Sequence, residues 1–157
     1  MIPEKVRRVL DAHDLSALEF ESGSTPTAET AAARIGVEVG QIAKSLLFRG
    51  ASGRLVMIVC AGDRRVSSGA AKRLAGEKLS MANAEETENA TGFRPGGVCP
   101  FGVEGVDVYI DESLRDWPVV YPAAGNDATG VPTNYGQLLE ITGGRTCAVT
   151  AAPLPGM

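Results

Sequence analysis

Apolar residues recur at helical spacing in several stretches of the chain, and a glycine follows most of these stretches. Val6, Val9 and Leu10 share one face of a helix that the pattern predicts over 3–13. Ser and Thr residues around Pro26 and a glycine at position 36 delimit a second helix over 28–35. The same signals predict further helices over 70–74, 85–90 and 134–141.

Short apolar runs between these helices predict strands. Residues 42–48 and 55–60 form two such runs around a glycine-bounded turn, which indicates a β-hairpin. Other strands or extended segments are expected over 15–21, 106–110, 119–121, 128–132 and 146–150, and a Pro/Gly tail over 151–157 is expected to fray. Because hairpins mix with inserted helices and no regular βαβ alternation appears, the pattern predicts an α+β fold. It would hold a mixed, curved β-sheet with surrounding helices, in a single domain over residues 1–157.

Composition narrows the class of protein. No apolar run approaches the roughly 20 residues of a membrane span, and the N-terminus lacks a signal-peptide core. Cys60, Cys99 and Cys147 are far apart and form no Cys-x-x-Cys pair. The sequence therefore predicts a protein of the reducing cytoplasm, without disulfides, metal, cofactor or membrane attachment.

Charge is distributed unevenly along the chain. Residues 1–80 carry 12 basic and 9 acidic side chains, whereas residues 81–157 carry 3 and 10, and the net charge is −4. The negative total disfavours DNA binding, but an acidic protein can bind nucleic acid through one basic face. Arg64, Arg65, Lys72 and Arg73 are the candidates for such a face, and a solvated helix surface is the alternative.

A loop over 94–102, with the sequence RPGGVCPFG, is too rich in glycine and proline for a helix or central strand. Gly96 and Gly97 would let a ligand approach the backbone, and Pro95 and Pro100 would stiffen the loop. Backbone N–H groups in such a loop can stabilise an oxyanion or a phosphate. Lys44 is the second candidate, because a lysine inside the apolar run 42–48 either reaches solvent or lines a pocket.

Conventional catalytic sets are missing from the sequence. His13 is the only histidine and stands at the end of the first predicted helix, so Ser-His-Asp and Cys-His arrangements have little support. Asp111 and Glu112 lie in a predicted turn and are expected to be solvated. Cys99 could act as a nucleophile, but no second histidine is present to activate it.

Four segments together resemble the YbaK family, also described as the prolyl-tRNA synthetase-associated editing domain. They are the helix TAETAAARIG at 27–36 leading into QIAKSLLF at 41–48, the hairpin and helix over 56–74, the loop region 90–102, and AAGN at 123–126 followed by YGQLL at 135–139. Lys44 stands where the family has its key lysine, and Gly96 to Pro100 matches its Gly-x-x-x-Pro loop. Unlike some members, the stretch 126–130 has no histidine.

The resemblance implies a single-domain, trans-acting aminoacyl-tRNA deacylase. It would hydrolyse the ester between a wrong, small amino acid, such as Ala, Cys or Ser, and the 3′ end of tRNA(Pro) or a related tRNA. It assigns catalysis to Lys44, Gly96, Gly97 and Pro100. Substrate binding falls to Thr27, Ser45, Val98, Cys99, Gly125 and Asn126. An aminoacyl-tRNA synthetase would be a second partner.

Two rival functions remain open at this point. The chain could be a non-catalytic module that binds tRNA or a synthetase, in which case Lys44 need not share a pocket with Gly96. It could also be a thiol-dependent hydrolase that uses Cys99 as its nucleophile.

Overall fold

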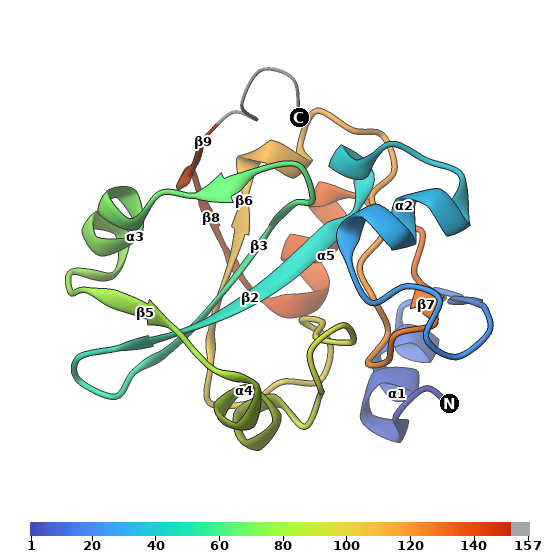
Figure 1. Cartoon of the computed structure of the whole chain (residues 1–157), viewed down its shortest axis with the longest axis horizontal. Coiled ribbons are helices and arrows are strands. Elements are labelled where there is room, and N and C mark those ends of the chain that lie inside the picture. The colour runs from blue at the N-terminus through green and yellow to red at the C-terminus, as the bar shows by residue number, and fades with distance from the viewer. Residues whose placement is uncertain (152–157) are drawn as a thin grey trace.

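A mixed five-stranded sheet lies at the centre of the molecule (Figure 1), in the order β5-β2-β3-β6-β8. The computed structural model describes residues 1–151. The strands are β2 (Ala43–Gly50), β3 (Leu55–Ala61), β5 (Leu79–Met81), β6 (Asp107–Asp111) and β8 (Arg145–Cys147). Strand β2 runs antiparallel to β3 and β5, whereas β6 runs parallel to β3 and β8. The predicted hairpin and the predicted α+β class are confirmed.

Within residues 1–151, five helices surround the sheet, and four of them begin and end at capping residues in the sequence. They are α1 (Glu4–Ala12), α2 (Ala28–Ile35), α3 (Ser68–Ala75), α4 (Ala84–Thr91) and α5 (Tyr135–Thr142). The hydroxyls of Thr27 and Ser67 and the amides of Asn83 and Asn134 accept hydrogen bonds at the starts of α2 to α5. Within residues 1–151, no helix has the length and apolar character that a membrane crossing requires.

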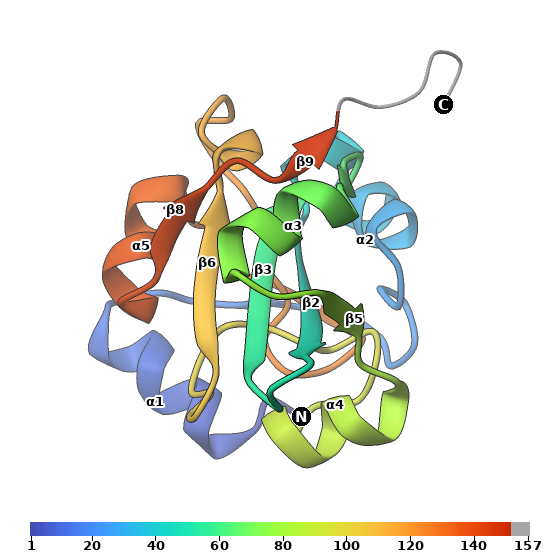
Figure 2. The same ribbon diagram turned by 90° about the vertical axis from the view of Figure 1, so that its left-hand side faces the viewer.

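The two faces of the sheet bury separate hydrophobic clusters. Helices α1 and α5 cover one face together with Phe93 and the loop over 94–102, which we call the glycine-rich loop. The side chains of Val6, Leu138, Phe93 and Phe101 are almost fully buried there. Helix α3 covers the other face, where Ala71 packs with side chains of β2, β3 and β6. Figure 2 shows α3 in front of the sheet with α1 and α5 to one side.

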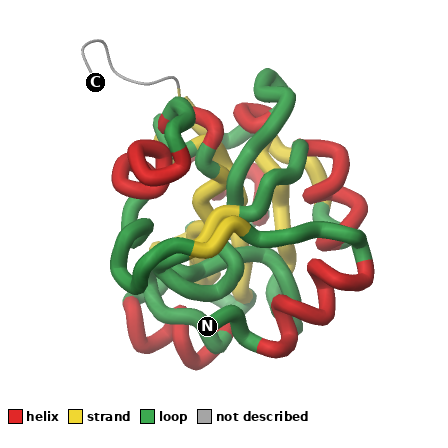
Figure 3. Tube along the Cα trace, turned by 90° about the vertical axis from the view of Figure 1, so that its right-hand side faces the viewer, coloured by secondary structure: helices red, strands yellow, loops and turns green. Residues whose placement is uncertain are grey.

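Several predicted strands differ from the structure. The strand expected over 15–21 shrinks to β1 (Leu18–Glu19), which pairs with β7 (Thr129–Gly130) and lies among the long loops in Figure 3. The segment 119–121 makes only isolated bridges, through Val120 and Tyr121. The segment 146–150 splits into β8 and β9 (Thr150–Ala151), and β9 pairs with β4 (Arg65–Val66). The remainder of the tail predicted to fray, 152–157, lies outside the described residues.

Asp111 was expected to be solvated, but it is buried. Its hydrogen bonds also account for the break between β8 and β9. The residue is fully buried at the end of β6, at the start of a short 3-10 helix, η2 (Glu112–Leu114). Its carboxylate accepts hydrogen bonds from Val149 N–H at 2.8 Å, Thr150 Oγ1 at 2.8 Å and Ser113 N–H at 3.1 Å. Because Val149 bonds to the carboxylate, the strand pairing is interrupted there. Burial raises the pKa of Asp111, but these hydrogen bonds outweigh burial and the net pKa lies below its usual value.

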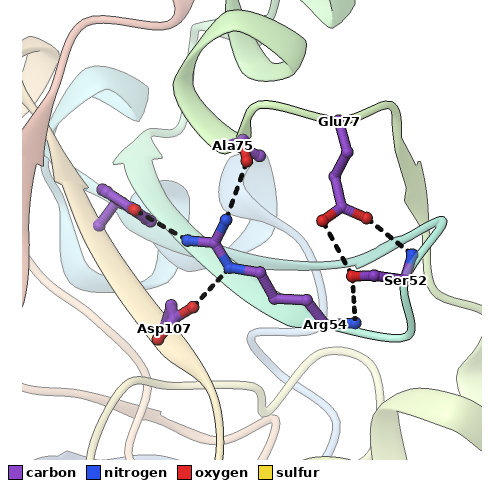
Figure 4. Close-up of polar contacts among 6 residues, drawn as sticks. Ser52, Arg54, Ala75, Glu77 and Asp107 are labelled. Carbon is purple, nitrogen blue, oxygen red and sulfur yellow. Dashed lines mark hydrogen bonds and ion pairs between the residues drawn. The ribbon is translucent and has the colours of Figure 1, made fainter.

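Polar side chains fasten the turn of the β2–β3 hairpin to its surroundings (Figure 4). Arg54 donates to Asp107 at 2.6 Å, to the carbonyl of Ala75 at 3.0 Å and to the hydroxyl of Tyr109 at 3.1 Å. Glu77 accepts from the N–H and the hydroxyl of Ser52, and these two bonds lower its pKa. The hairpin is therefore tied to both β6 and the segment that follows α3.

Candidate active site

A cavity of about 280 Å³ opens beside β2, between the start of α2 and the glycine-rich loop. We call it the β2-edge cavity. Its wall is formed by residues from five parts of the chain, at 25–31, 42–47, 81–87, 95–98 and 121–129. Most of the lining side chains are small, among them Ala28, Ala31, Ala43, Ala82 and Ala123. A cavity at the small end of the range for ligand sites suits a small group.

The cavity exists because part of the β2 edge has no neighbouring strand. The N–H of Ala43 donates to Tyr121, and the carbonyl of Leu47 accepts from Ala82, so these backbone groups point away from β3. Backbone groups of alternate residues point to the same side of a strand. The N–H and carbonyl of Ser45, halfway between, therefore also point toward this open edge. Among residues 1–151, neither group has a backbone partner there.

Lys44 lines the cavity, and its ammonium group is held in place. The Nζ atom donates to the carbonyl of Arg64 at 2.6 Å and to the carbonyl of Gly62 at 3.3 Å. These two bonds fix the position of the charge at the turn after β3. An ammonium group has three N–H donors, and two of them are used by these bonds.

The two adjacent glycines of the loop have different structural roles. Gly96 lines the cavity with a φ of +92°, and an added Cβ would lie 3.3 Å from the backbone of Pro26. Gly97 has no such φ, but its added Cβ would lie 2.6 Å from Cα of Asn126. Gly97 therefore allows the glycine-rich loop to pack directly against the 123–130 segment. Its N–H donates to Arg94, whereas the N–H groups of Gly96 and Val98 have no partner among the described residues.

Hydrogen bonds hold the 123–130 segment against the loop that precedes α2. The Asp127 carbonyl accepts from Thr25 N–H at 2.8 Å, and its carboxylate accepts from Gly23 N–H at 3.1 Å. Asn126 turns inward on its own segment, because its side chain accepts from Ala128 N–H at 3.0 Å. Thr129 lines the cavity and accepts from Ala124 N–H at 2.9 Å.

Of the predicted site residues, Lys44, Gly96, Thr27, Ser45 and Val98 line the same cavity. Its lining among the described residues does not include Gly97, Pro100, Cys99, Gly125 or Asn126. Gly97 instead packs closely against Asn126, and Gly125 packs against Pro3 and Phe93. Pro100 lines a different, polar hollow near Arg54 and Asp107.

None of the three cysteines is among the described residues that line this cavity. Cys99 is fully buried, and burial raises its pKa to about 12. Burial also raises the pKa of Cys60 to about 12. Within residues 1–151, no group of three or more His, Cys, Asp or Glu side chains is placed to hold a metal ion.

The four basic candidates divide into two pairs. Arg64 belongs to the turn whose carbonyls hold Lys44, and Arg65 follows it. The guanidinium of Arg64 lies 3.9 Å from the carboxylate of Asp63. Lys72 and Arg73 are exposed on the last turns of α3, on the other side of the sheet from α1 and α5.

Sequence reasoning missed several residues of the cavity wall, notably Thr25 and Tyr121. Thr25 is 4% exposed although it stands in a polar stretch that reads as a helix start. Its burial comes from the distant 123–130 segment, and no local pattern signals that contact.

Comparisons with known proteins identify relatives of this chain. The model of the aminoacyl-tRNA editing domain family matches residues 22–141, which include all five parts of the cavity wall. YwhH of Bacillus subtilis (strain 168) is 38% identical over 125 residues, which cover 79% of each chain. EbsC of Enterococcus faecalis is provisionally named a Cys-tRNA(Pro)/Cys-tRNA(Cys) deacylase. It is 25% identical over 148 residues, 91% of this chain and 90% of EbsC.

Longer proteins and solved structures extend the comparison. Proline–tRNA ligase of Bacillus licheniformis is 32% identical over 113 residues, and the match spans 71% of this chain but 19% of the ligase. A crystal structure provisionally described as a trans-editing enzyme for prolyl-tRNA synthetase superposes with a TM-score of 0.85. It is 34% identical, and the match covers 97% of this chain and all of that one. With a family match over most of its length, the chain belongs to the aminoacyl-tRNA editing domain family.

Proposed function

We propose that this protein is a trans-acting deacylase that hydrolyses the ester of a mischarged tRNA. The observation that carries the proposal is that Lys44 and Gly96, which come from distant parts of the chain, line one small cavity in a member of an editing family. A positive charge and a glycine-containing loop with N–H groups left free are an arrangement suited to an ester carbonyl.

In this mechanism, water attacks the carbonyl carbon of the aminoacyl ester. Negative charge develops on the carbonyl oxygen, and the N–H groups of Gly96 and Val98 are its proposed donors because both residues line the cavity and neither group has a partner among the described residues. Lys44 supplies a positive charge to the carbonyl or to the terminal nucleotide. The ribose oxygen leaves with a proton that derives from the attacking water, and a neighbouring ribose hydroxyl helps to position that water.

Selection by size follows from the small lining side chains. A cavity of about 280 Å³ walled by alanines admits a short aminoacyl group and excludes longer ones, which is the logic of a second sieve. Alanine, cysteine or serine on tRNA(Pro) or a related tRNA are the substrates we propose. Since charged tRNA is used in the cytoplasm, we place the protein there, with an aminoacyl-tRNA synthetase as a second partner.

The rival functions predict different behaviour. A module that only binds tRNA or a synthetase needs no lysine in the cavity, whereas Lys44 is one of its lining residues. A thiol hydrolase needs an accessible thiolate at Cys99, which is fully buried and has a raised pKa. Cys99→Ser should therefore leave deacylation largely intact.

The test is amino-acid release from tRNA(Pro) charged separately with Ala, Cys, Ser and Pro. We expect release of at least one small amino acid well above the spontaneous rate, with Pro-tRNA(Pro) spared. tRNA binding without release from any of the four would favour the binding module. Loss of release only in Cys99→Ser would favour the thiol hydrolase.

A further inference from the structure

Some hydroxyl groups of the β2-edge cavity form hydrogen bonds within the protein, and others do not. Five Ser and Thr residues line the wall, and three of them are engaged within the protein. Thr27 caps α2, Thr87 donates to the carbonyl of Asn83 at 2.8 Å, and Thr129 bonds to Ala124 N–H. The other two are Thr25 and Ser45.

Thr25 Oγ1 and Ser45 Oγ are buried and have no hydrogen-bond partner among the described residues. Thr25 is 4% exposed, so its hydroxyl is also largely screened from solvent. A buried hydroxyl without a partner destabilises the protein, because it has lost its bonds to water and gained none in return. A site that binds a polar ligand group recovers this cost when the ligand supplies the missing bond, after a turn about the Cα–Cβ bond.

The backbone beside Ser45 supplies a separate recognition element. Its carbonyl points toward the open edge of β2 and can accept a hydrogen bond from an ammonium group. The α-ammonium of an aminoacyl ester therefore has a backbone partner of its own. The two hydroxyls are left for the side chain of the amino acid.

We propose that Thr25 and Ser45 make the cavity selective for an aminoacyl group whose short side chain ends in a hydroxyl, as in serine. This inference rests on the proposed deacylase function and specifies its substrate class. A hydroxyl both donates and accepts, so it can satisfy both side chains, whereas the methyl group of alanine leaves them unpaired. Sites built to bond a substrate hydroxyl discriminate strongly against analogues that lack it.

The test compares seryl and alanyl esters on the same tRNA with wild type, Thr25→Val, Ser45→Ala and Thr133→Val. Wild type should release serine at least about tenfold faster than alanine, and each of the first two variants should reduce that ratio about tenfold by slowing serine alone. Thr133→Val is the matched control, because Thr133 is a buried threonine outside the cavity wall whose hydroxyl already bonds to Gln137, so the ratio should stay at the wild-type value. An unchanged ratio in Thr25→Val and Ser45→Ala, or an equal loss on both esters, would overturn the inference.

Binding and stability measurements keep this inference separable from the deacylase proposal. The probes are 3′-(L-seryl)amino-3′-deoxyadenosine and its L-alanyl counterpart, whose amide bonds are not the ester. Calorimetry should show tighter binding of the seryl compound to wild type and loss of that preference in Thr25→Val, even if no ester is hydrolysed. Thr25→Val should melt at or above the wild-type temperature, because an unpaired hydroxyl is removed. A clear drop would show that Thr25 is already bonded in the free protein, and equal binding of the two compounds would also contradict the proposal.

Discussion

Lys44 combines a structural and a proposed electrostatic role in one side chain. Lys44→Met keeps much of the side-chain volume but removes the charge and both bonds to the carbonyls of Gly62 and Arg64. We expect the deacylation rate to fall on the order of 100-fold or more, the usual effect of losing one contact to the developing charge. Single-turnover release of amino acid from mischarged tRNA measures this.

Circular dichroism and thermal melting serve as controls for the Lys44 variant, since the turn after β3 also loses its cap. Full activity in a folded Lys44→Met protein would exclude the proposed role. Lys44→Arg is a second control, because it keeps the positive charge but replaces the ammonium group with a larger, planar guanidinium. Partial activity in Lys44→Arg would show that the charge itself contributes to the rate.

Gly96 offers a second prediction at the residue scale, with a matched control elsewhere in the chain. Gly96 and Gly53 have φ values of +92° and +90°, but an added Cβ is close to Pro26 at Gly96 and meets nothing within 4 Å at Gly53. Alanine at either position therefore carries a similar backbone strain of about 1–2 kcal/mol. Only Gly96→Ala should slow deacylation, because only it crowds the cavity.

Steady-state release rates and melting temperatures of the two alanine variants test this pair. Similar melting shifts with a rate loss confined to Gly96→Ala are expected. Equal activity in both variants would remove the glycine-rich loop from the proposed mechanism.

At the scale of elements, Asp111 joins the end of β6 to the segment between β8 and β9. Asp111→Asn should lower the free energy of unfolding at pH 7 by about 2–3 kcal/mol, because hydrogen bonds to a buried charged group are lost or reversed. Since the pKa of Asp111 is lowered on folding, the stabilisation is present above the unfolded pKa near 3.9 and is lost as pH falls through the lower folded value.

Urea unfolding from pH 7 down to pH 3 measures that dependence. The gap between wild type and Asp111→Asn should narrow in the acid range. Glu112→Gln is the control. Glu112 is exposed and its carboxylate lies 3.8 Å from the guanidinium of Arg115, and a surface ion pair of this kind contributes little to stability. A constant gap at all pH values would mean that the charge of Asp111 does not contribute.

The predictability of the fold differs between element types. The limits of α2 to α5 could be read from the sequence, because caps such as Thr27 and Asn134 and the glycine after each of these helices act locally. Strands β4 and β5 could not, because they are short and are defined by partners far along the chain. The expectation that Asp111 is solvated was wrong for the same reason. Two of its hydrogen-bond partners, Val149 and Thr150, are about 40 residues away in the sequence.

The candidate site was partly predictable on the same grounds. A lysine in an apolar strand and a Gly/Pro loop are visible locally, and both reach the cavity. Thr25 was missed because its burial depends on the 123–130 segment, and the packing role of Gly97 depends on Asn126.

At the scale of the whole molecule, the basic residues define the surface expected to meet tRNA. Reversing Arg64, Arg65, Lys72 and Arg73 to Glu should weaken tRNA binding and flatten its salt dependence. Each lost phosphate contact should reduce the slope of log affinity against log salt by about 0.7–0.9. Filter binding of tRNA between low and physiological salt measures the slope.

Arg7→Glu with Arg8→Glu on α1 is the control for net charge, because both side chains are exposed on a helix that packs against the other face of the sheet. The single pairs Arg64/Arg65 and Lys72/Arg73 should be tested apart, since only the first adjoins the turn that holds Lys44. If the fourfold reversal and both pair reversals leave the slope at its wild-type value, these residues are only a solvated surface.

The open stretch of the β2 edge also bears on aggregation. Unpaired strand edges recruit strands from other molecules, and proteins usually guard them. Here the unpaired backbone of Ser45 lies between the contacts of Ala43 with Tyr121 and of Leu47 with Ala82, so the exposed stretch is too short to seat a foreign strand. Helix α2 and the glycine-rich loop stand on either side of it. The protein can thus keep hydrogen-bonding groups open to a small ligand without offering a template for fibril growth.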